Sequence, residues 1–329
     1  MQTREIGQSG IEASVIGLGT WAMGGWMWGG TDEKAAIEAI HASLDNGVSL
    51  IDTAPAYGLG VSEELVGKAI KGKRDQVVLA TKCGLVWHTN KGNHFFNENG
   101  KPVHRYLGAD AIHYEVEQSL KRLQTDYLDL YITHWQDPTT PVEETMDALQ
   151  TLKKAGKIRA IGISNVSKED LAAYQKCGVV DAVQEKYNLI ERELEDSLLP
   201  MTIKNDVACL SYSSLAMGLL SGKVSPERTF TGDDQRITNP MFAVDNRRKV
   251  QEFCQSIEPI ATQKNITVAQ LVIAATLQQP GITYALCGAR NAQQAVENAI
   301  AGQVILSLEE VNLINTKSHE FFRKLELAQ

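Results

Sequence analysis

The chain has 329 residues, of which 43% are hydrophobic and 22% charged, and its formal net charge is −8. This acidic balance excludes a broad nucleic-acid-binding surface, so any anion site must be local. No apolar run approaches the roughly 20 residues of a membrane span. The N-terminal MQTREIGQSG has no signal-peptide core, and the five cysteines are scattered without a CxxC pair. We therefore expect a reduced, cytoplasmic protein with no membrane partner.

Strand-like and helix-like segments alternate along the chain after a short hairpin candidate at residues 3–14. The strand candidates are VIGLG (15–19), SLIDTA (49–54), QVVLATK (76–82), LDLYITH (128–134), IRAIGIS (158–164), DAVQEKYN (181–188), ACLSYS (208–213) and ITYALCG (282–288). Apolar strands followed by helices indicate a parallel sheet. We predict one domain, residues 1–329, folded as a (β/α)8 TIM barrel, with an open doubly wound sheet as the alternative.

Three segments interrupt this alternation. We expect long loops after the third and the seventh strand, namely the polar and aromatic insertion of residues 85–108 and residues 217–246. The tail from Ser307 is expected to be an extra helix. Four helix starts carry a cap residue and an acid or amide three positions later, which predicts capping boxes; they are TPVE (140–143), SKED (167–170), TVAQ (267–270) and SLEE (307–310).

GLGTWA at residues 17–22 matches the glycine pattern of an open dinucleotide-binding sheet. That pattern requires a helix that begins at its third position, and here the chain continues MGGWMWGGTDEK. We interpret the segment as a glycine- and tryptophan-rich loop that lines a pocket.

Polar side chains stand at successive strand ends, and in a barrel these emerge at one mouth. Each one alone has an ordinary interpretation, such as a turn cap, a solvated lysine or a buried histidine. Their recurrence at so many strand ends favours a common site. The residues are Asp52, Lys82, His134, Ser164, Asn165, Gln184 and Tyr212.

Tyr57 follows Asp52 by five residues and adds a phenol to this set. A tyrosine with a pKa near 10 is a poor acid at neutral pH, and a neighbouring ammonium such as Lys82 lowers that pKa. Asp52 can hold the ammonium in place, and His134 can donate a hydrogen bond to a carbonyl oxygen. The set suits carbonyl reduction, in which the oxygen gains a proton as hydride reaches carbon.

These residues resemble the aldo-keto reductases, including the branch of the potassium-channel β subunits. IDTAPAYGLGVSEELVGKAI is similar to the family signature, VVLATK to its lysine strand and LDLYITHW to its histidine strand; GKIRAIGISN and ALCGARNAQQAVENA match two further segments. The resemblance implies a barrel that binds an extended nicotinamide cofactor, with Tyr57 as general acid, Lys82 and Asp52 as its helpers and His134 as the residue that orients the carbonyl. It implies cofactor contacts from Thr20, Trp21, Asp52, Ser164, Asn165, Gln184, Tyr212, Ser213, Leu215, Gly218, Lys223, Gly288, Arg290, Gln294, Glu297 and Asn298.

Two positions depart from the family pattern. Ser214 replaces a proline found in many relatives, which predicts a freer loop around Ser213 and Leu215. Gly288 and Ala289 replace a Lys-Ser pair, so Arg290 must supply the charge for a 2′-phosphate. We expect NADP(H) as the cofactor, with NAD(H) as the alternative.

The five tryptophans follow the first, third and fourth predicted strands. A substrate pocket for a small aldehyde or ketone is therefore expected from Trp21, Tyr57, Trp87, His134 and Trp135. The alternative is that the tryptophans at 26 and 28 only pack a loop. The histidines at 88, 94 and 104 match no common metal spacing, so no metal is expected.

Two other functions fit parts of this pattern. Potassium-channel β subunits bind the cofactor but act chiefly as regulatory partners, so a sensor with weak reductase activity is one alternative. A Schiff-base aldolase that uses Lys82 is the other. The sequence leaves the oligomeric state and the natural substrate open, with a monomer favoured.

Overall fold

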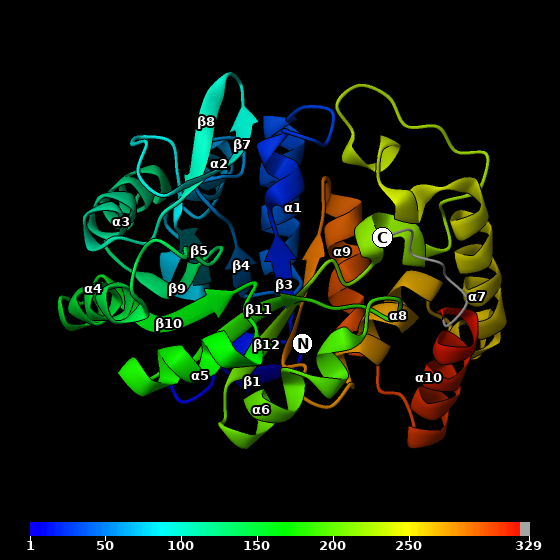
Figure 1. Ribbon diagram of the computed structural model, residues 1–329. Coiled ribbons are helices and arrows are strands. Elements are labelled where there is room, and N and C mark those ends of the chain that lie inside the picture. Colours follow the sequence, from blue (N-terminus) through cyan, green and yellow to red (C-terminus); the bar gives the residue numbers. More distant parts are fainter. Residues whose placement is uncertain (323–329) are drawn as a thin grey trace.

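The computed structural model describes residues 1–322 and shows eight parallel strands in a closed barrel (Figure 1). The last strand pairs with the first, Ala285 opposite Ile16, so the prediction of a TIM barrel is confirmed over the open sheet. The strands are β3 (Ile16–Gly19), β4 (Leu50–Asp52), β5 (Val78–Cys83), β9 (Leu128–Thr133), β10 (Ile158–Ser164), β11 (Ala182–Lys186), β12 (Ala208–Tyr212) and β13 (Tyr284–Gly288).

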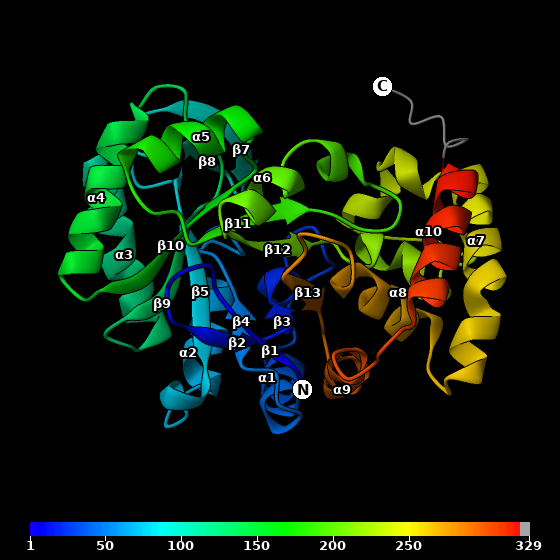
Figure 2. The same cartoon turned by 90° about the horizontal axis from the view of Figure 1, so that it is seen from below.

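Helices cover the outside of the barrel and bury an apolar face against the strands. The helices that follow barrel strands are α1 (Glu33–Asp45), α2 (Val61–Ala69), α3 (Ala109–Leu123), α4 (Val142–Lys154), α5 (Lys168–Cys177), α6 (Leu199–Lys204), α8 (Val268–Leu277) and α9 (Ala292–Ala301). The helix predicted from Ser307 is α10 (Leu308–Phe322), and it lies beside a further helix outside the barrel repeat, α7 (Val244–Gln263) (Figure 2). Among residues 1–322, no helix is both long and apolar enough to cross a membrane.

The predicted hairpin closes the amino-terminal end of the barrel. It consists of β1 (Thr3–Glu5) and β2 (Glu12–Ser14), and Gly10 takes the positive φ of 72° that the turn requires. The residues between its strands, Ile6 and Ile11, are buried in the same cluster as Leu50 and Leu130 inside the barrel. The opposite end is therefore the one available for a site.

The insertion after β5 is a small antiparallel sheet and not the loop we expected. Its strands are β6 (Leu85–Val86), β7 (Asn93–Glu98) and β8 (Lys101–Arg105). Asn99 and Gly100 both have positive φ, 49° and 75°, as the tight turn of a two-residue hairpin demands. The Asn-Gly pair was therefore a hairpin signal in the sequence. The loop after β12 contains only the short 3-10 helices η4 (Ala216–Ser221), η5 (Gln235–Ile237) and η6 (Pro240–Phe242).

Three of the four predicted helix caps are confirmed. Ser167 and Thr267 form capping boxes, and Ser307 Oγ accepts the Glu310 N–H at 3.2 Å. The prediction for Thr140 is wrong, because α4 begins after Pro141 and receives no side-chain cap. Thr140 Oγ1 instead donates to the Asp137 carboxylate at 2.7 Å, a charge-assisted hydrogen bond that holds the side chain at Asp137.

Candidate active site

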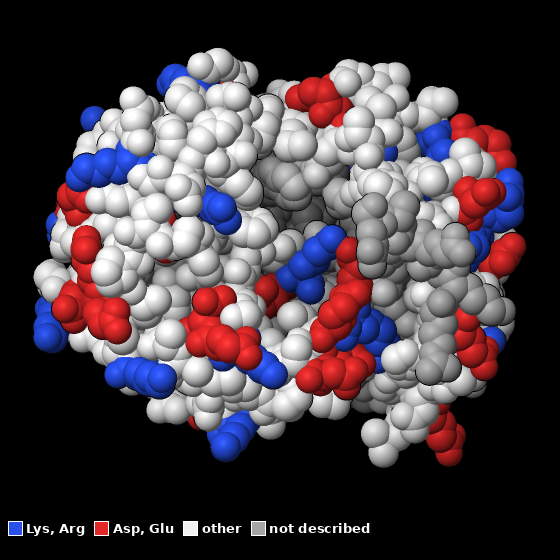
Figure 3. Space-filling view, viewed as in Figure 1, with Lys and Arg blue, Asp and Glu red and all other residues white. Residues whose placement is uncertain are grey.

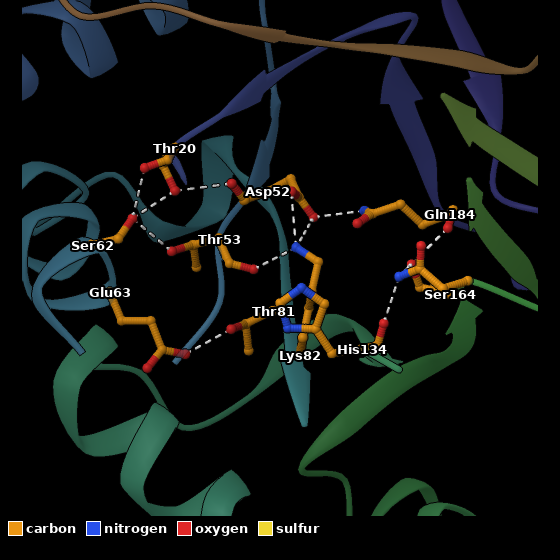
Figure 4. Close-up of polar contacts among 11 residues, drawn as sticks. Thr20, Asp52, Thr53, Ser62, Glu63, Thr81, Lys82, His134, Ser164 and Gln184 are labelled. Atoms are coloured by element: carbon orange, nitrogen blue, oxygen red, sulfur yellow. Dashed lines mark hydrogen bonds and ion pairs between the residues drawn. The ribbon is translucent and has the colours of Figure 1, made fainter. Parts of the chain in front are cut away.

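The carboxyl ends of three neighbouring strands bring the predicted catalytic residues together (Figure 4). Asp52 is the last residue of β4, Lys82 lies near the end of β5 and His134 directly follows β9. The strands β4, β5 and β9 are adjacent in the barrel, so their ends share one mouth. Tyr57 reaches the same mouth from the turn after β4. Basic and acidic side chains are interspersed on the face seen in Figure 3, which is hollowed near its centre.

A buried ion pair forms the floor of this mouth. Lys82 is 0% exposed, and its Nζ donates to Asp52 Oδ1 at 2.8 Å, to Asp52 Oδ2 at 2.9 Å and to the Thr53 carbonyl at 2.8 Å. The three hydrogens of the ammonium are thus directed to these acceptors. Burial lowers the pKa of Lys82, and the Asp52 carboxylate opposes that shift. Gln184 Nε2 also donates to Asp52 Oδ1 at 2.8 Å, which ties β11 to the pair.

Tyr57 lies against this pair without losing its proton. Lys82 Nζ is 4.9 Å from the centroid of the Tyr57 ring. Burial, and secondly the Asp52 charge, raise the pKa of Tyr57 well above 10. The prediction of a lowered pKa is therefore wrong, because burial of the phenol outweighs the effect of the ammonium, whose hydrogens are directed to Asp52 and Thr53. The phenol remains protonated at every working pH.

His134 stands at the edge of Tyr57 as a neutral imidazole. The two ring centroids are 5.8 Å apart and the planes are nearly perpendicular, at 82°. Burial, and secondly the Lys82 charge, lower the pKa of His134 well below 6.5. A neutral imidazole has one N–H donor, so the mouth presents a phenol O–H and an imidazole N–H side by side.

A chain of buried hydroxyls behind the ion pair escaped the sequence interpretation. Ser62 Oγ donates to Thr20 Oγ1 at 2.7 Å and lies 3.0 Å from Thr53 Oγ1, and all three residues are 0% exposed. Thr20 Oγ1 in turn donates to the Asp52 carbonyl at 3.0 Å. These contacts fix the backbone that carries Asp52 and Thr53. Nothing in the local pattern around Ser62, at a helix start, distinguishes it from an ordinary cap residue.

The residues predicted to hold the nicotinamide meet at the same mouth. Ser164 Oγ donates to the Gln184 carbonyl at 2.6 Å, and Tyr212 Oη donates to Asn165 Oδ1 at 2.8 Å. Asn165 Nδ2 donates to the His134 carbonyl at 2.7 Å. The ends of β9, β10, β11 and β12 are therefore joined by hydrogen bonds, next to the half-buried ring of Tyr212.

The loop after β12 is more firmly anchored than the sequence suggested. Ser214 is 1% exposed, and its Oγ contacts the carbonyls of Ser211 and Leu286 at 3.3 and 3.2 Å. The predicted freer loop is thus not observed at this residue. Ser213 and Gly218 have positive φ, 59° and 96°, and a Cβ at Gly218 would meet open space. Leu215, between them, packs against both main core clusters.

The residues predicted for the adenosine end form a second, exposed group at the start of α9. The Arg290 backbone N–H donates to Gln294 Oε1 at 2.8 Å, and Asn298 Nδ2 donates to the Gly288 carbonyl at 3.0 Å. The Arg290 guanidinium donates to the carbonyls of Trp28 and Gly30, at 2.9 and 3.2 Å. The loop after β3 is therefore an unpredicted neighbour of this group.

Two further contacts surround this group. Lys223 Nζ lies 3.2 Å from Glu297 Oε2, which joins the loop after β12 to α9. The Asp233 carboxylate accepts the backbone N–H groups of Met27 and Gly29, both at 3.0 Å. The loops after β3 and β12 are thus bonded to each other, a contact between segments about 200 residues apart that no local pattern predicts.

The predicted pocket aromatics occupy different surroundings. Trp21 stacks on Tyr57 with centroids 6.2 Å apart, so it lies at the mouth. Trp135 packs on Phe95 of the insertion at 5.2 Å. Trp87 lines a cavity of about 540 Å³ between α2 and α3. Within residues 1–322, no group of three or more His, Cys, Asp or Glu side chains is placed to hold a metal ion.

Comparison with known proteins agrees with this geometry. The model of the Aldo/keto reductase family matches residues 15–319. Aldo-keto reductase YhdN of Bacillus subtilis (strain 168) is 48% identical over 319 residues, 96% of this chain and 93% of that protein. The NADH-specific methylglyoxal reductase of Escherichia coli (strain K12) is 37% identical over 320 residues, 95% of this chain and 97% of that protein.

Solved structures give the same result. The glycerol dehydrogenase AKR11B4 from Gluconobacter oxydans superposes with a TM-score of 0.87 at 36% identity, over 97% of this chain and 95% of its own. An aldo/keto reductase from Klebsiella pneumoniae in complex with NADP and acetate gives 0.73 at 31% identity, over 96% and 95%. Family model, sequence relatives and fold agree, and the chain belongs to the aldo/keto reductase family.

Proposed function

We propose that the protein reduces small aldehydes and ketones to alcohols with NADPH, and that Tyr57 is the acid that protonates the oxygen. The observation that carries this proposal is the placement of the Tyr57 phenol next to the His134 imidazole and against the buried Lys82–Asp52 pair. Burial raises the pKa of the phenol and lowers that of the imidazole, which favours the neutral form of both. Membership of an oxidoreductase family with a nicotinamide cofactor is consistent with it.

The residues at the mouth fit a nicotinamide. Hydroxyl and amide groups of Ser164, Asn165 and Gln184 lie together beside the aromatic face of Tyr212, and such a set suits a carboxamide on a flat ring. In this proposal those three residues hold the carboxamide and Tyr212 stacks on the ring. A bound reduced nicotinamide supplies the hydride, which no side chain of the protein can provide.

The chain's own residues handle the proton. His134 and Tyr57 both donate hydrogen bonds to the carbonyl oxygen and polarise it. As hydride bonds to the carbonyl carbon, the C=O π bond breaks and the oxygen takes the Tyr57 proton. In this proposal the Lys82 ammonium, 4.9 Å from the ring, offsets part of the cost of burying the phenolate that remains, and the phenolate then recovers a proton from solvent.

The geometry argues against Lys82 as a nucleophile. A Schiff base needs a free amine with a lone pair, and Lys82 Nζ is an ammonium held at 2.8 to 2.9 Å by three acceptors. Releasing that amine would leave the Asp52 carboxylate buried without its partner. The contacts of Lys82 therefore favour a role in a reductase over a role as the nucleophile of an aldolase.

The preference for NADPH rests on Arg290. Its guanidinium is exposed at the adenosine end and uses two N–H groups on backbone carbonyls, which leaves others for a 2′-phosphate. One relative is named an NADH-specific methylglyoxal reductase, and one structural neighbour is a complex with NADP. Relatives of this chain are thus named with either cofactor, NADH or NADP. The proposal that this chain prefers NADPH rests on Arg290.

The test is a reductase assay on purified protein. NADPH and NADH are each mixed with methylglyoxal, glyceraldehyde and nitrobenzaldehyde, and cofactor oxidation is followed at 340 nm. Turnover that is faster with NADPH supports the proposal. Tight NADPH binding without reduction of any carbonyl would point to a regulatory protein, and equal rates with both cofactors would remove the role given to Arg290.

A further inference from the structure

Glu185 is a buried carboxyl that the proposed reaction does not use. It follows Gln184 in β11, and since alternate side chains of a strand point to opposite faces, it points away from Asp52 and the barrel interior. Glu185 is 5% exposed, and its Oε1 accepts the backbone N–H of Val166 at 3.0 Å. Burial raises the pKa of Glu185 to about 8, so the carboxyl is neutral at pH 7.

The backbone that Glu185 holds is unusual. Asn165, the residue before Val166, has a φ of 56°, in the left-handed region that asparagine tolerates better than most residues. Its side chain contacts the His134 carbonyl at 2.7 Å, Ser164 Oγ at 3.1 Å and Tyr212 Oη at 2.8 Å. One strained residue therefore connects three strand ends of the mouth.

We propose that Glu185 is a positioning residue for the nicotinamide subsite. Its carboxyl fixes the N–H of Val166 and thereby the left-handed turn at Asn165, which in turn orients Tyr212 and the His134 backbone. This inference rests on the proposed function, since that function assigns the nicotinamide to Asn165 and Tyr212. A neutral carboxyl performs this task without placing a negative charge beside the mouth.

Asp181 provides a matched comparison in the same pair of strands. It lies just before β11 and is 1% exposed, and its Oδ2 accepts the backbone N–H of Ile161 in β10 at 2.8 Å. Both carboxyls thus reach from β11 to the backbone of β10 or its end. Ile161 lies within β10 and Val166 beyond its carboxyl end, so only Glu185 acts on the mouth.

The experiment compares four variants by NADPH affinity, kcat and thermal stability. Glu185→Ala removes the acceptor and is expected to raise the Kd for NADPH about tenfold, the effect of one unpartnered buried N–H. Glu185→Gln keeps a neutral acceptor of the same length and should bind within about twofold of wild type. Asp181→Ala should lower Tm and leave the Kd unchanged. Kd is measured by quenching of tryptophan fluorescence.

Glu185→Asp withdraws the acceptor by one methylene and repeats the test if the alanine variant does not fold; it should also weaken NADPH binding. A wild-type Kd in Glu185→Ala or Glu185→Asp despite a lower Tm would show a purely structural role and overturn the inference. Equal losses in Glu185→Gln and Glu185→Ala would overturn it too. Failure of the wild-type protein to bind NADPH would instead refute the proposed function.

Discussion

The two parts of the candidate site are built in opposite ways. Around Asp52 and Lys82 the polar groups come from strand ends, are almost fully buried and have short, multiple hydrogen bonds. Around Arg290 and Lys223 they come from a loop and a helix start and stand in solvent. Chemistry requires charges that stay fixed during the reaction. A cofactor must enter and leave, and exposed contacts allow this.

The difference has an energetic side. The pair formed by Lys223 and Glu297 has side chains that are 60% and 29% exposed, and such pairs contribute roughly 0 to 1 kcal/mol. Removal of one partner from a buried pair such as Lys82–Asp52 leaves an uncompensated charge and costs several times more. Substitutions around Lys82 and Asp52 should therefore lower both stability and turnover strongly, whereas substitutions around Arg290 and Lys223 should mainly change the affinity for the cofactor.

Lys82→Met is expected to have the largest effect. It leaves the Asp52 carboxylate buried without its ammonium, which should lower the free energy of unfolding by about 3 to 5 kcal/mol. Turnover should be lost at the same time, since the phenolate has no cation to stabilise it. Urea unfolding and the 340 nm assay measure the two quantities.

The double variant Asp52→Asn with Lys82→Met separates the two losses. With no charge left to bury, it should recover most of the stability but none of the turnover. If the single variant Lys82→Met were as stable as wild type, the Asp52 carboxylate would not need the ammonium in order to be buried. The energetic difference between the buried and the exposed part of the site would then be contradicted.

Glu115→Gln tests how burial of a polar group outside the site makes stability depend on pH. Glu115 in α3 is 4% exposed, accepts the Gly84 N–H at 2.8 Å and has its pKa raised by burial from 4.5 to about 8. Between these values the folded chain holds a proton that the unfolded chain has released, so this contribution to stability is lost as pH rises from 4.5 through 8. Urea unfolding should show wild type losing a few kcal/mol relative to Glu115→Gln between pH 5 and 8.5. Parallel pH curves for the two proteins would contradict this.

Arg290→Ala tests the exposed part. Loss of a guanidinium from a 2′-phosphate should raise the Kd for NADPH by about tenfold while the Kd for NADH and the kcat at saturating cofactor stay near wild type. Arg290→Lys keeps the charge but not the planar guanidinium, so its Kd for NADPH should lie between those of wild type and Arg290→Ala. A large fall in kcat would show that this residue also affects the chemistry.

The smallest expected effect is that of pH on the reduction itself. The pKa of Tyr57 lies well above 10 and that of His134 well below 6.5, so neither group changes its protonation between pH 6.5 and 9. The kcat of reduction should therefore be flat over this range. A bell-shaped profile centred near pH 7 would mean that one of these groups titrates there.

Most of the barrel, and the meeting of the four residues proposed to be catalytic, could be predicted from the sequence, because short apolar runs define parallel strands and their polar ends define the mouth. It did not contain the Ser62–Thr20 contact or the Asp233 contact to the loop after β3, since these join segments far apart in the chain. The pKa of Tyr57 was predicted in the wrong direction because the direction is set by the burial of the phenol and by its distance from Asp52, which the sequence does not show. The insertion sheet was missed although Asn99 and Gly100 signalled its turn.

In the proposed reaction Tyr57 donates the proton, and other residues of the mouth bind the cofactor. The direct measurement is turnover and NADPH affinity of Tyr57→Phe in the same preparation. We expect kcat to fall by a factor of about 10² to 10⁴, the contribution of a positioned general acid, with the Kd for NADPH within about twofold of wild type. A variant as active as wild type would contradict the mechanism. Loss of NADPH binding together with turnover would contradict the division between the two parts.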